Sequence, residues 1–298
     1  MSETCCEASR THHEPIEGSA AESTSVWIIL EYREAWGAKA LPESTLSDAV
    51  KQHLMAWEKA LPGSRIQFVR HTGRCEGPLH FWLGTSGLSG ARIFEWSVPQ
   101  AEALLEFDAP EILAAIERGE TPAGAQPVER PMVLVCTNGR RDVCCSVEGI
   151  PVAKAFEQQE GLEVWHTTHL GGHRFAATLL ELPRGLCYGR VKADEVPALA
   201  EAILAGRIDR LDRLRGRTAL SCSEQAAETF WRREHGLLDS DALASVEHVE
   251  SDGQVVVTLH DTQGQRFEVR VERRELGVEA PPSCGKPPRP VAGWFPVA

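Results

Sequence analysis

The stretch PMVLVCTNGRRDVCC (131–145) decides the fold, because an apolar strand, residues 131–136, ends in a cysteine and runs directly into a loop that contains two more. Hydrophobic periodicity and turn residues then predict a regular series of elements after this loop. The predicted elements are a helix at 150–159, a strand at 162–167, a hairpin of 175–182 and 185–191 across Pro183-Arg184-Gly185, and a helix at 193–206. The order is therefore β-α-β-β-β-α.

The same order occurs earlier in the chain. The predicted elements there are a strand at 25–32, a helix at 45–61, strands at 65–70, 79–84 and 91–97, and a helix that opens at Pro99. Two copies offset by about 105 residues indicate an internal duplication of one small α/β sandwich.

The rest of the chain differs in composition. The first residues are polar, a Gly- and Pro-rich segment separates the two copies, and an Arg-rich stretch followed by alternating strands and a Pro-rich end (275–298) completes the chain. We expect the Arg-rich stretch, 209–237, to be helical and the Pro-rich end to wrap back over the body. The predicted division is a flexible N-terminus (1–24), a first unit (25–116), a linker (117–130), a second unit (131–208) and a helical and β-hairpin extension (209–298).

The predicted fold class is α/β, with two tandem thioredoxin-like units. A parallel β-α-β half followed by an antiparallel hairpin and a helix is the connectivity of that fold. It places the loop after the first strand beside the loop that enters the hairpin. These two loops hold the most unusual residues of this chain.

Composition limits the classes of function. The chain has 298 residues, with 31 Lys and Arg against 43 Asp and Glu, and a formal net charge of −12. Such a charge argues against nucleic acid as a partner, because phosphates require a basic face. No apolar run approaches the roughly 18 residues of a membrane span, and no secretory signal is visible. We therefore expect a cytoplasmic protein with no membrane or nucleic-acid partner.

Four side chains in the second unit carry the chemical signal. Cys136 and Cys145 enclose eight residues, and His169 and His173 flank Leu170-Gly171-Gly172. Two adjacent glycines favour a tight loop over a helix, which would direct both imidazoles toward one point. Two thiolates and two imidazoles suit zinc or an iron–sulfur cluster. From an extended backbone Cys144 and Cys145 point apart, so one is expected to be a ligand and the other not.

The runs CTNGRRDVCC (136–145) and HLGGHRFAATLLELPRGLCYGRV (169–191) resemble the sucrase/ferredoxin-like family, and the flanking runs before 41 and after 282 resemble it too. This resemblance implies a thioredoxin-like ferredoxin domain with a [2Fe-2S] cluster in a non-Rieske arrangement. Its ligands would be Cys136, Cys145, His169 and His173, with Cys144 a non-ligating neighbour. Asn138 departs from the family, where histidine is common, but it is not at a ligand position.

Three classes of function remain open from the sequence. The first is an electron-transfer protein, more an electron carrier than a stand-alone enzyme, whose redox partner protein the residues do not name. The second is a structural zinc protein that uses the same four ligands. The third is a thiol–disulfide oxidoreductase that uses Cys136 or the Cys144–Cys145 pair. The absence of a Cys-x-x-Cys at the start of a helix argues against it, and a disulfide between Cys144 and Cys145 would favour it.

The proposed ligand set predicts a redox potential that depends on pH. In Rieske centres, two imidazoles in place of two thiolates raise the potential from about −400 mV to roughly −150 to +300 mV. An imidazole ligand loses its outer proton more easily when the cluster is oxidised, so electron transfer would be coupled to proton transfer. A redox titration from about pH 6 to pH 10 is expected to show a falling potential. A potential independent of pH would contradict the coupling.

Residues near the ligands have less specific roles. Arg140, Arg141 and Arg174 either raise the potential by donating to sulfur or pair with surface acids, and Asp142 is expected to brace the loop. His166 is expected to be structural. The first unit has Glu31-Tyr32-Arg33 where Cys136 would be, so it is expected to be a scaffold or docking half. The remaining expectations are a solvated, salt-bridged helix face for Arg207, Arg210, Arg213, Arg215 and Arg217, and burial for Cys222 and Cys284.

Overall fold

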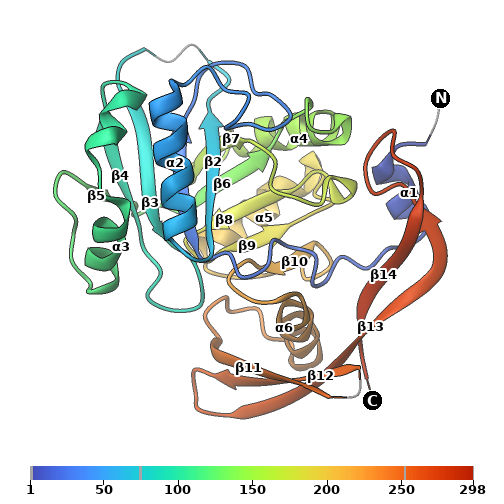
Figure 1. Ribbon diagram of the computed structural model, residues 1–298. Helices are drawn as coiled ribbons and strands as arrows, with labels where there is room; N and C mark the ends of the chain where they lie inside the picture. Colours follow the sequence, from blue (N-terminus) through green and yellow to red (C-terminus); the bar gives the residue numbers. More distant parts are fainter. Residues whose placement is uncertain (1–2, 74–75, 252, 298) are drawn as a thin grey trace.

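The computed structural model describes residues 3–73, 76–251 and 253–297. Two sheets organise this part of the chain (Figure 1). A mixed ten-stranded sheet has the order β10-β9-β8-β6-β7-β2-β1-β3-β4-β5, and a separate antiparallel sheet has the order β11-β12-β13-β14. The fold is therefore mixed α/β, as predicted. None of the described helices is long and apolar enough to cross a membrane.

The first half contributes one end of the large sheet. Its elements are β1 (Val26–Glu31), α2 (Asp48–Ala60), β2 (Ser64–Arg70), β3 (Leu79–Thr85), β4 (Ile93–Val98), a 3-10 helix η1 (Ala101–Glu106), α3 (Ala109–Glu117) and β5 (Gln126–Pro127). Strand β1 pairs in parallel with β2 and antiparallel with β3, which pairs antiparallel with β4. The helix expected at Pro99 is thus a 3-10 turn followed by a short α-helix, and the expected linker contains β5.

The second half repeats these pairings. Its elements are β6 (Met132–Cys136), α4 (Val143–Phe156), β7 (Glu163–Thr167), η2 (His173–Phe175), β8 (Leu179–Leu182), β9 (Leu186–Tyr188), η3 (Ala193–Glu195) and α5 (Val196–Leu204). Strand β6 pairs in parallel with β7 and antiparallel with β8, and β8 forms a hairpin with β9. The ends of β6 and β7 and the entrance to β8 therefore lie together, which positions the candidate site.

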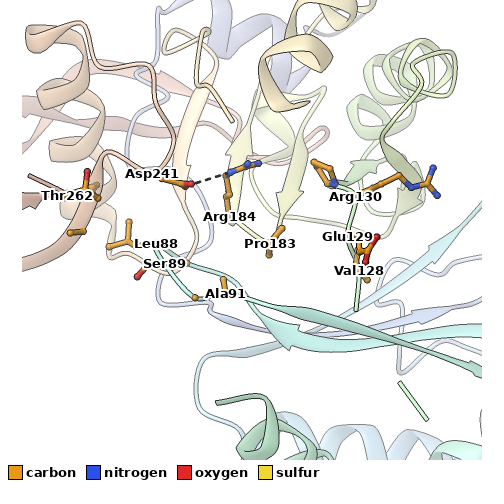
Figure 2. Close-up of a pocket in the computed structure, with 15 residues that line it drawn as sticks. Leu88, Ser89, Ala91, Val128, Glu129, Arg130, Pro183, Arg184, Asp241 and Thr262 are labelled. Carbon is orange, nitrogen blue, oxygen red and sulfur yellow. Dashed lines mark ion pairs between the residues drawn. The ribbon is translucent and has the colours of Figure 1, made fainter. Parts of the chain in front are cut away.

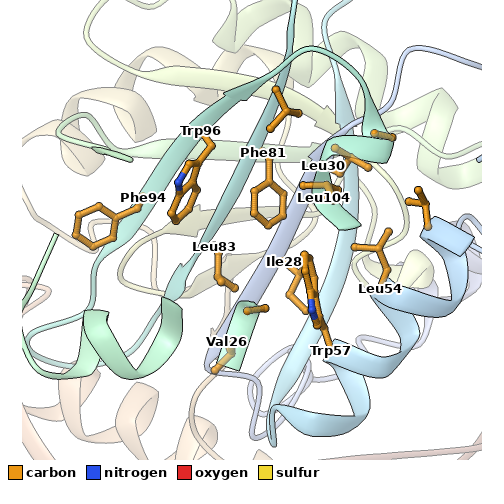
Figure 3. Close-up of a cluster of buried hydrophobic side chains, with 14 of the residues drawn as sticks. Val26, Ile28, Leu30, Leu54, Trp57, Phe81, Leu83, Phe94, Trp96 and Leu104 are labelled. Carbon is orange, nitrogen blue, oxygen red and sulfur yellow. The ribbon is translucent and has the colours of Figure 1, made fainter. Parts of the chain in front are cut away.

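The two halves join through a short antiparallel contact between β2 and β7. Side chains alternate across each strand, so each half has two apolar faces. One face of the first half packs under α2 and α3 in a cluster that includes Ile28, Trp57 and Phe81 (Figure 3). Its opposite face contributes Trp27 to a second cluster that contains Leu134 and Cys136 of the second half. The candidate site is thus supported from the first half.

The N-terminal segment is ordered, so the prediction of a flexible N-terminus was wrong. Residues Cys5–Thr11 form helix α1, with Thr4 and Glu7 in a capping box. Cys5 and Cys6 are buried, and α1 lies beside the turn between β13 and β14 (Figure 1). Segments distant in sequence cover this helix, and a local reading of the sequence could not include them.

The C-terminal extension also differs from the prediction of a helix over 209–237. Its elements are β10 (Leu214–Arg217), α6 (Cys222–His235), β11 (Leu243–Ser251), β12 (Gln254–Asp261), β13 (Arg266–Ala280) and β14 (Arg289–Pro296). Strand β10 extends the large sheet beyond β9, and α6 packs on the four-stranded sheet through Trp231. The segment 281–288 returns to α1 and α4, in accord with the expected wrapping of the Pro-rich end.

Buried Glu181 in β8 predicts a stability that falls as pH rises. Its Oε1 accepts a hydrogen bond from Arg184 Nη1 at 2.9 Å, while its Oε2 has no partner among the described atoms. Burial raises the pKa of this carboxyl to about 7 from an ordinary value of 4.5. As pH rises from about 4.5 to 7, this carboxyl ionises in the unfolded chain but stays protonated in the folded chain. The free energy of unfolding of the wild type therefore falls by up to about 3 kcal/mol over this range.

Glu181→Gln removes this titration. Denaturation measured at about pH 4.5 and at about pH 8 gives the change in the free energy of unfolding between the two pH values. This free energy is expected to fall more in the wild type than in the variant. Exposed Glu201→Gln is the control and should follow the wild type. Equal pH dependence in Glu181→Gln and the wild type would contradict the assignment.

Candidate metal centre

Helix α4 brings the two predicted cysteine ligands together. Cys136 is the last residue of β6, and Cys145 lies in the first turn of α4. The side chain of Asp142 caps this helix by accepting a hydrogen bond from Cys144 N at 3.0 Å. The helix begins at Val143 rather than at 150, because Asp142 caps it there and Pro151 lies inside it rather than in its first turn. Cys144 and Cys145 are thus on a helix, where they point in different directions.

The loop between β7 and η2 places the two imidazoles next to each other. Gly171 and Gly172 have φ of +92° and +65°, so the chain turns sharply between the histidines. His169 Nδ1 lies 3.7 Å from Cys145 Sγ, and His173 Nδ1 lies 3.4 Å from His169 Nε2. This is the tight loop that the glycines predict.

Three of the four predicted ligands form one compact group. One donor atom each from Cys136, Cys145 and His169 lies within 4.8 Å of the other two. His173 is outside this group but adjoins His169. Its Nε2 donates to Pro282 O at 2.7 Å, which leaves the Nδ1 lone pair facing His169. A metal-binding histidine commonly donates its other ring N–H to a carbonyl in this way.

The two buried thiols share a proton. The pKa of Cys136 is well below its usual value, because the Cys145 thiol donates a hydrogen bond to it and His169 stabilises its thiolate. The pKa of Cys145 is raised, because its proton bridges to the Cys136 sulfur in a buried place. Loss of a proton is therefore favoured at Cys136 over Cys145. Burial lowers the pKa of His173 and keeps its imidazole neutral, the form that binds metals.

Two arginines from distant segments hold the histidine loop. Arg65 of β2 donates to His169 O at 2.6 Å and to Leu170 O at 3.2 Å. Arg215 of β10, which is 1% exposed, donates to Gly171 O at 3.0 Å and to Ser19 Oγ at 3.1 Å. Sequence reasoning missed both arginines, because only the tertiary fold brings them to the loop.

Gly172 has no room for a side chain. A Cβ there would lie 2.3 Å from the Arg215 guanidinium, whereas a Cβ on Gly171 meets nothing within 4 Å. Gly172→Ala is expected to lower the free energy of unfolding by about 2–4 kcal/mol, from backbone strain and displaced hydrogen bonds of Arg215. Gly171→Ala, which adds backbone strain alone, is the matched control. Chemical denaturation measures the free energy of unfolding of each variant. An equal loss in Gly172→Ala and Gly171→Ala would contradict the role of Arg215.

The other predicted neighbours have varied roles. Arg140 and Arg141 are exposed, and Arg174 pairs with Glu14 at 2.6 Å. Asp142 caps α4, so it braces the loop as expected. His166 is buried and bonded to Thr137 and Glu157, which fits a structural role.

The Arg-rich stretch is not one solvated helix face. Arg207, Arg210 and Arg213 form ion pairs near the surface, but Arg215 and Arg217 lie in β10 and are fully buried. The charge pattern gave a wrong prediction because a strand interrupts the stretch, and α6 packs on that strand.

A second group of potential ligands lies on the other side of the first turn of α4. It consists of Cys5, Asp142, Cys144 and Cys284, with one donor atom of each within 4.8 Å of the others. The cysteine pair at 5–6 was visible in the sequence, but its nearness to residues 144 and 284 was not. The described cysteines are free, so Cys144 and Cys145 form no disulfide.

A cavity of about 510 Å³ lies at the opposite end of β6 (Figure 2). Pro131 before β6, Leu88 after β3 and the Arg184–Asp241 ion pair line it. It is separate from the cysteines and histidines, which follow β6. The large cavity and the Cys/His chemistry are therefore distinct features.

Comparisons with known proteins show which family and which curated relative the sequence resembles. A curated protein of Meyerozyma guilliermondii, "Altered inheritance of mitochondria protein 32", is 31% identical over 101 residues, which cover 30% of this chain. The chain spans 36% of the length of that relative. No solved structure matches. The sequence matches the sucrase/ferredoxin-like family over residues 5–216, more than half of its length and including all four predicted ligands, so the chain belongs to this family.

Proposed function

We propose that the chain is an electron-transfer protein whose second unit is a thioredoxin-like ferredoxin domain. Cys136, Cys145, His169 and His173 would hold a [2Fe-2S] cluster in it. The observation that carries the proposal is the convergence of two buried thiols and one imidazole within 4.8 Å, with a second imidazole 3.4 Å from the first. Family membership supports the same ligand set.

The donor set fits this cofactor. Cys136 and Cys145 are 0% and 1% exposed, and thiolates are the usual ligands of iron–sulfur clusters. His169 presents Nδ1 to Cys145, and His173 presents Nδ1 to His169. The hydrogen bond from His173 Nε2 to Pro282 O fixes its ring orientation, as is common for a ligand histidine.

When bound, the cluster would supply a one-electron redox centre with two neutral ligands, which raises its potential above that of a centre with four thiolates. The residues of this chain would set its surroundings. Arg65 and Arg215 hold the loop that carries the imidazoles, and the apolar side chains around Cys136 keep water away from the thiolates. Proton-coupled redox behaviour stays a prediction from the ligand chemistry.

The first unit would act as a scaffold. At its position equivalent to Cys136 it carries Glu31, which pairs with Arg33 at 2.7 Å. It also supplies Arg65 and, through Gly37 O, an acceptor for Asn138 Nδ2 at 3.1 Å. These contacts support a role in holding the two ligand loops.

Helix α4 would offer a surface for the redox partner protein. Val143, Val147 and Ile150 are 47%, 63% and 38% exposed, and their spacing places them along one side of α4. Arg140 and Arg141 are exposed just before this helix. An apolar patch with adjacent basic residues favours a partner with an acidic rim.

The test is the absorption spectrum of protein purified without chelators, with iron and sulfide assays. We expect a reddish-brown protein with about two irons and two sulfides per chain. His169→Cys and His173→Cys are expected to keep a cluster but shift its absorption bands, because thiolate replaces imidazole. A double variant with both changes should shift them further.

Other outcomes would favour the alternatives. A colourless protein with zinc lost in Cys136→Ser would indicate a structural zinc site at these ligands. A protein without metal at these residues would leave thiol–disulfide chemistry. An iron protein whose spectrum is unchanged in both histidine variants would exclude the histidines as ligands.

A further inference from the structure

Three thiols from distant parts of the chain meet beside the proposed cluster site. Cys5 Sγ lies 3.6 Å from Cys144 Sγ, Cys144 Sγ lies 3.5 Å from Cys284 Sγ, and Cys284 Sγ lies 3.5 Å from Cys5 Sγ. We propose that Cys5, Cys144 and Cys284 bind one zinc ion, with a carboxylate oxygen of Asp142 as the fourth donor. This site goes beyond the proposed electron-transfer function and uses none of its four ligands.

The distances match a single tetrahedral ion. With Zn–S bonds of about 2.3 Å, neighbouring sulfurs in a tetrahedron are about 3.8 Å apart. The three observed separations are nearly equal and slightly shorter than this value. Both carboxylate oxygens of Asp142 lie 3.8 Å from Cys5 Sγ, and one of its oxygens is within 4.8 Å of all three sulfurs. Only small outward shifts of the sulfurs would admit the ion.

The three thiols lie beside a buried charge, in a cluster that also contains Cys6 and Ala176. The carboxylate of Asp142 is 0% exposed, and the only basic side chain that the structure describes within 4.0 Å of it is His173, at 3.7 Å. Its oxygens accept hydrogen bonds from Ser283 Oγ at 2.7 Å and Cys284 N at 2.8 Å. A buried carboxylate beside three thiols is unusual for a packed core, whereas these donor types together are those of a closed zinc site.

The donor chemistry favours zinc. Soft thiolates select zinc over calcium or magnesium, and three thiolates with one further donor form a closed structural site. The three sulfurs are in mutual contact, so they leave room for one ion and not for a cluster. Binding would form three Zn–S bonds and release the three thiol protons to solvent.

The ion would tie together α1, α4 and the segment 281–288. That segment also carries Pro282, whose carbonyl accepts the hydrogen bond from His173 Nε2. The zinc site would therefore fix the orientation of a proposed cluster ligand from outside the cluster. It would also account for the order of the N-terminal segment, which is otherwise a short helix.

The experiment is metal analysis of the full chain, expressed with added zinc and purified without chelators. We expect about one zinc per chain in the wild type and at least a tenfold loss in Cys5→Ser and Cys284→Ser. Cys222→Ser, at a half-buried cysteine outside the group, should keep the zinc. X-ray absorption at the zinc edge of the wild type is expected to report three sulfurs at about 2.3 Å and one oxygen at about 2.0 Å. This measurement does not depend on whether the variants fold.

Cys136→Ser separates the two proposals. It should lose iron and keep zinc, whereas Cys284→Ser should lose zinc. Zinc lost with Cys136→Ser and kept with Cys284→Ser would overturn both proposals. A wild type with iron but no zinc, or with a Cys5–Cys284 disulfide in the purified protein, would overturn the zinc site and leave the cluster proposal standing.

Discussion

Cys136→Ser is expected to remove nearly all iron and sulfide from the purified chain. A serine oxygen is a harder and weaker ligand than a thiolate, and Cys136 is fully buried at the end of β6. Iron and sulfide assays, with the visible spectrum, measure the effect. We expect less than about a tenth of the wild-type iron content.

Cys187→Ser is the matched control. Cys187 is also buried, 2% exposed in neighbouring β9, and accepts a contact from Arg215 Nη1 at 3.4 Å, but it belongs to neither group of ligands. It should keep its iron. Equal iron loss in both variants, or iron retained in Cys136→Ser with normal circular dichroism, would contradict the ligand role of Cys136.

Glu228→Gln is expected to lower the free energy of unfolding by about 3–5 kcal/mol. Glu228 Oε1 accepts hydrogen bonds from Arg217 Nη2 at 3.2 Å and from Arg232 Nε at 3.0 Å, and all three side chains are 0% exposed. A neutral amide would leave two guanidinium groups buried without a counter-charge. Because this group joins β10 to α6, its loss should weaken the packing of α6 on the large sheet.

Denaturant titration followed by tryptophan fluorescence measures this loss. Glu201→Gln is the control, because Glu201 is exposed and its carboxylate lies 4.0 Å from Arg207 in a surface ion pair. Its effect should be below about 0.5 kcal/mol. A loss for Glu228→Gln as small as that of the control would contradict the importance of the buried ion group.

Local sequence patterns predicted much of the sheet. The apolar run ending at Cys136 and the turn at Pro183-Arg184-Gly185 correspond to β6 and to the β8–β9 hairpin. The predictions of secondary structure and order were wrong where contacts between residues far apart in the sequence determine the local structure. The strand β10 was hidden in an Arg-rich stretch, because Arg217 is buried through its ion pair with Glu228 and its hydrogen bonds to the distant carbonyls of Gly87 and Ser240. The order of helix α1 depends on contacts with segments more than 130 residues away.

In the candidate site, too, local patterns and strand order predicted some features, and contacts between distant segments determined the others. The predicted strand order was enough to predict that the loop after β6 meets the loop that enters β8. The start of α4 at Val143 was missed, although Asp142 is a common capping residue, because Pro151 favoured a later start. Cys284 was expected to be only a buried cysteine, since the sequence around it gives no sign that it lies close to Cys5 and Cys144 in space.

The most direct test of the central claim is electron paramagnetic resonance of the reduced protein, with histidine carrying a heavy nitrogen isotope. The account predicts the signal of one reduced [2Fe-2S] cluster, with hyperfine coupling to ligand nitrogen that changes with the isotope. It also predicts that this coupling weakens in His169→Cys and in His173→Cys. A cluster signal without coupling to histidine nitrogen, or a protein that holds no reducible iron, would contradict the account.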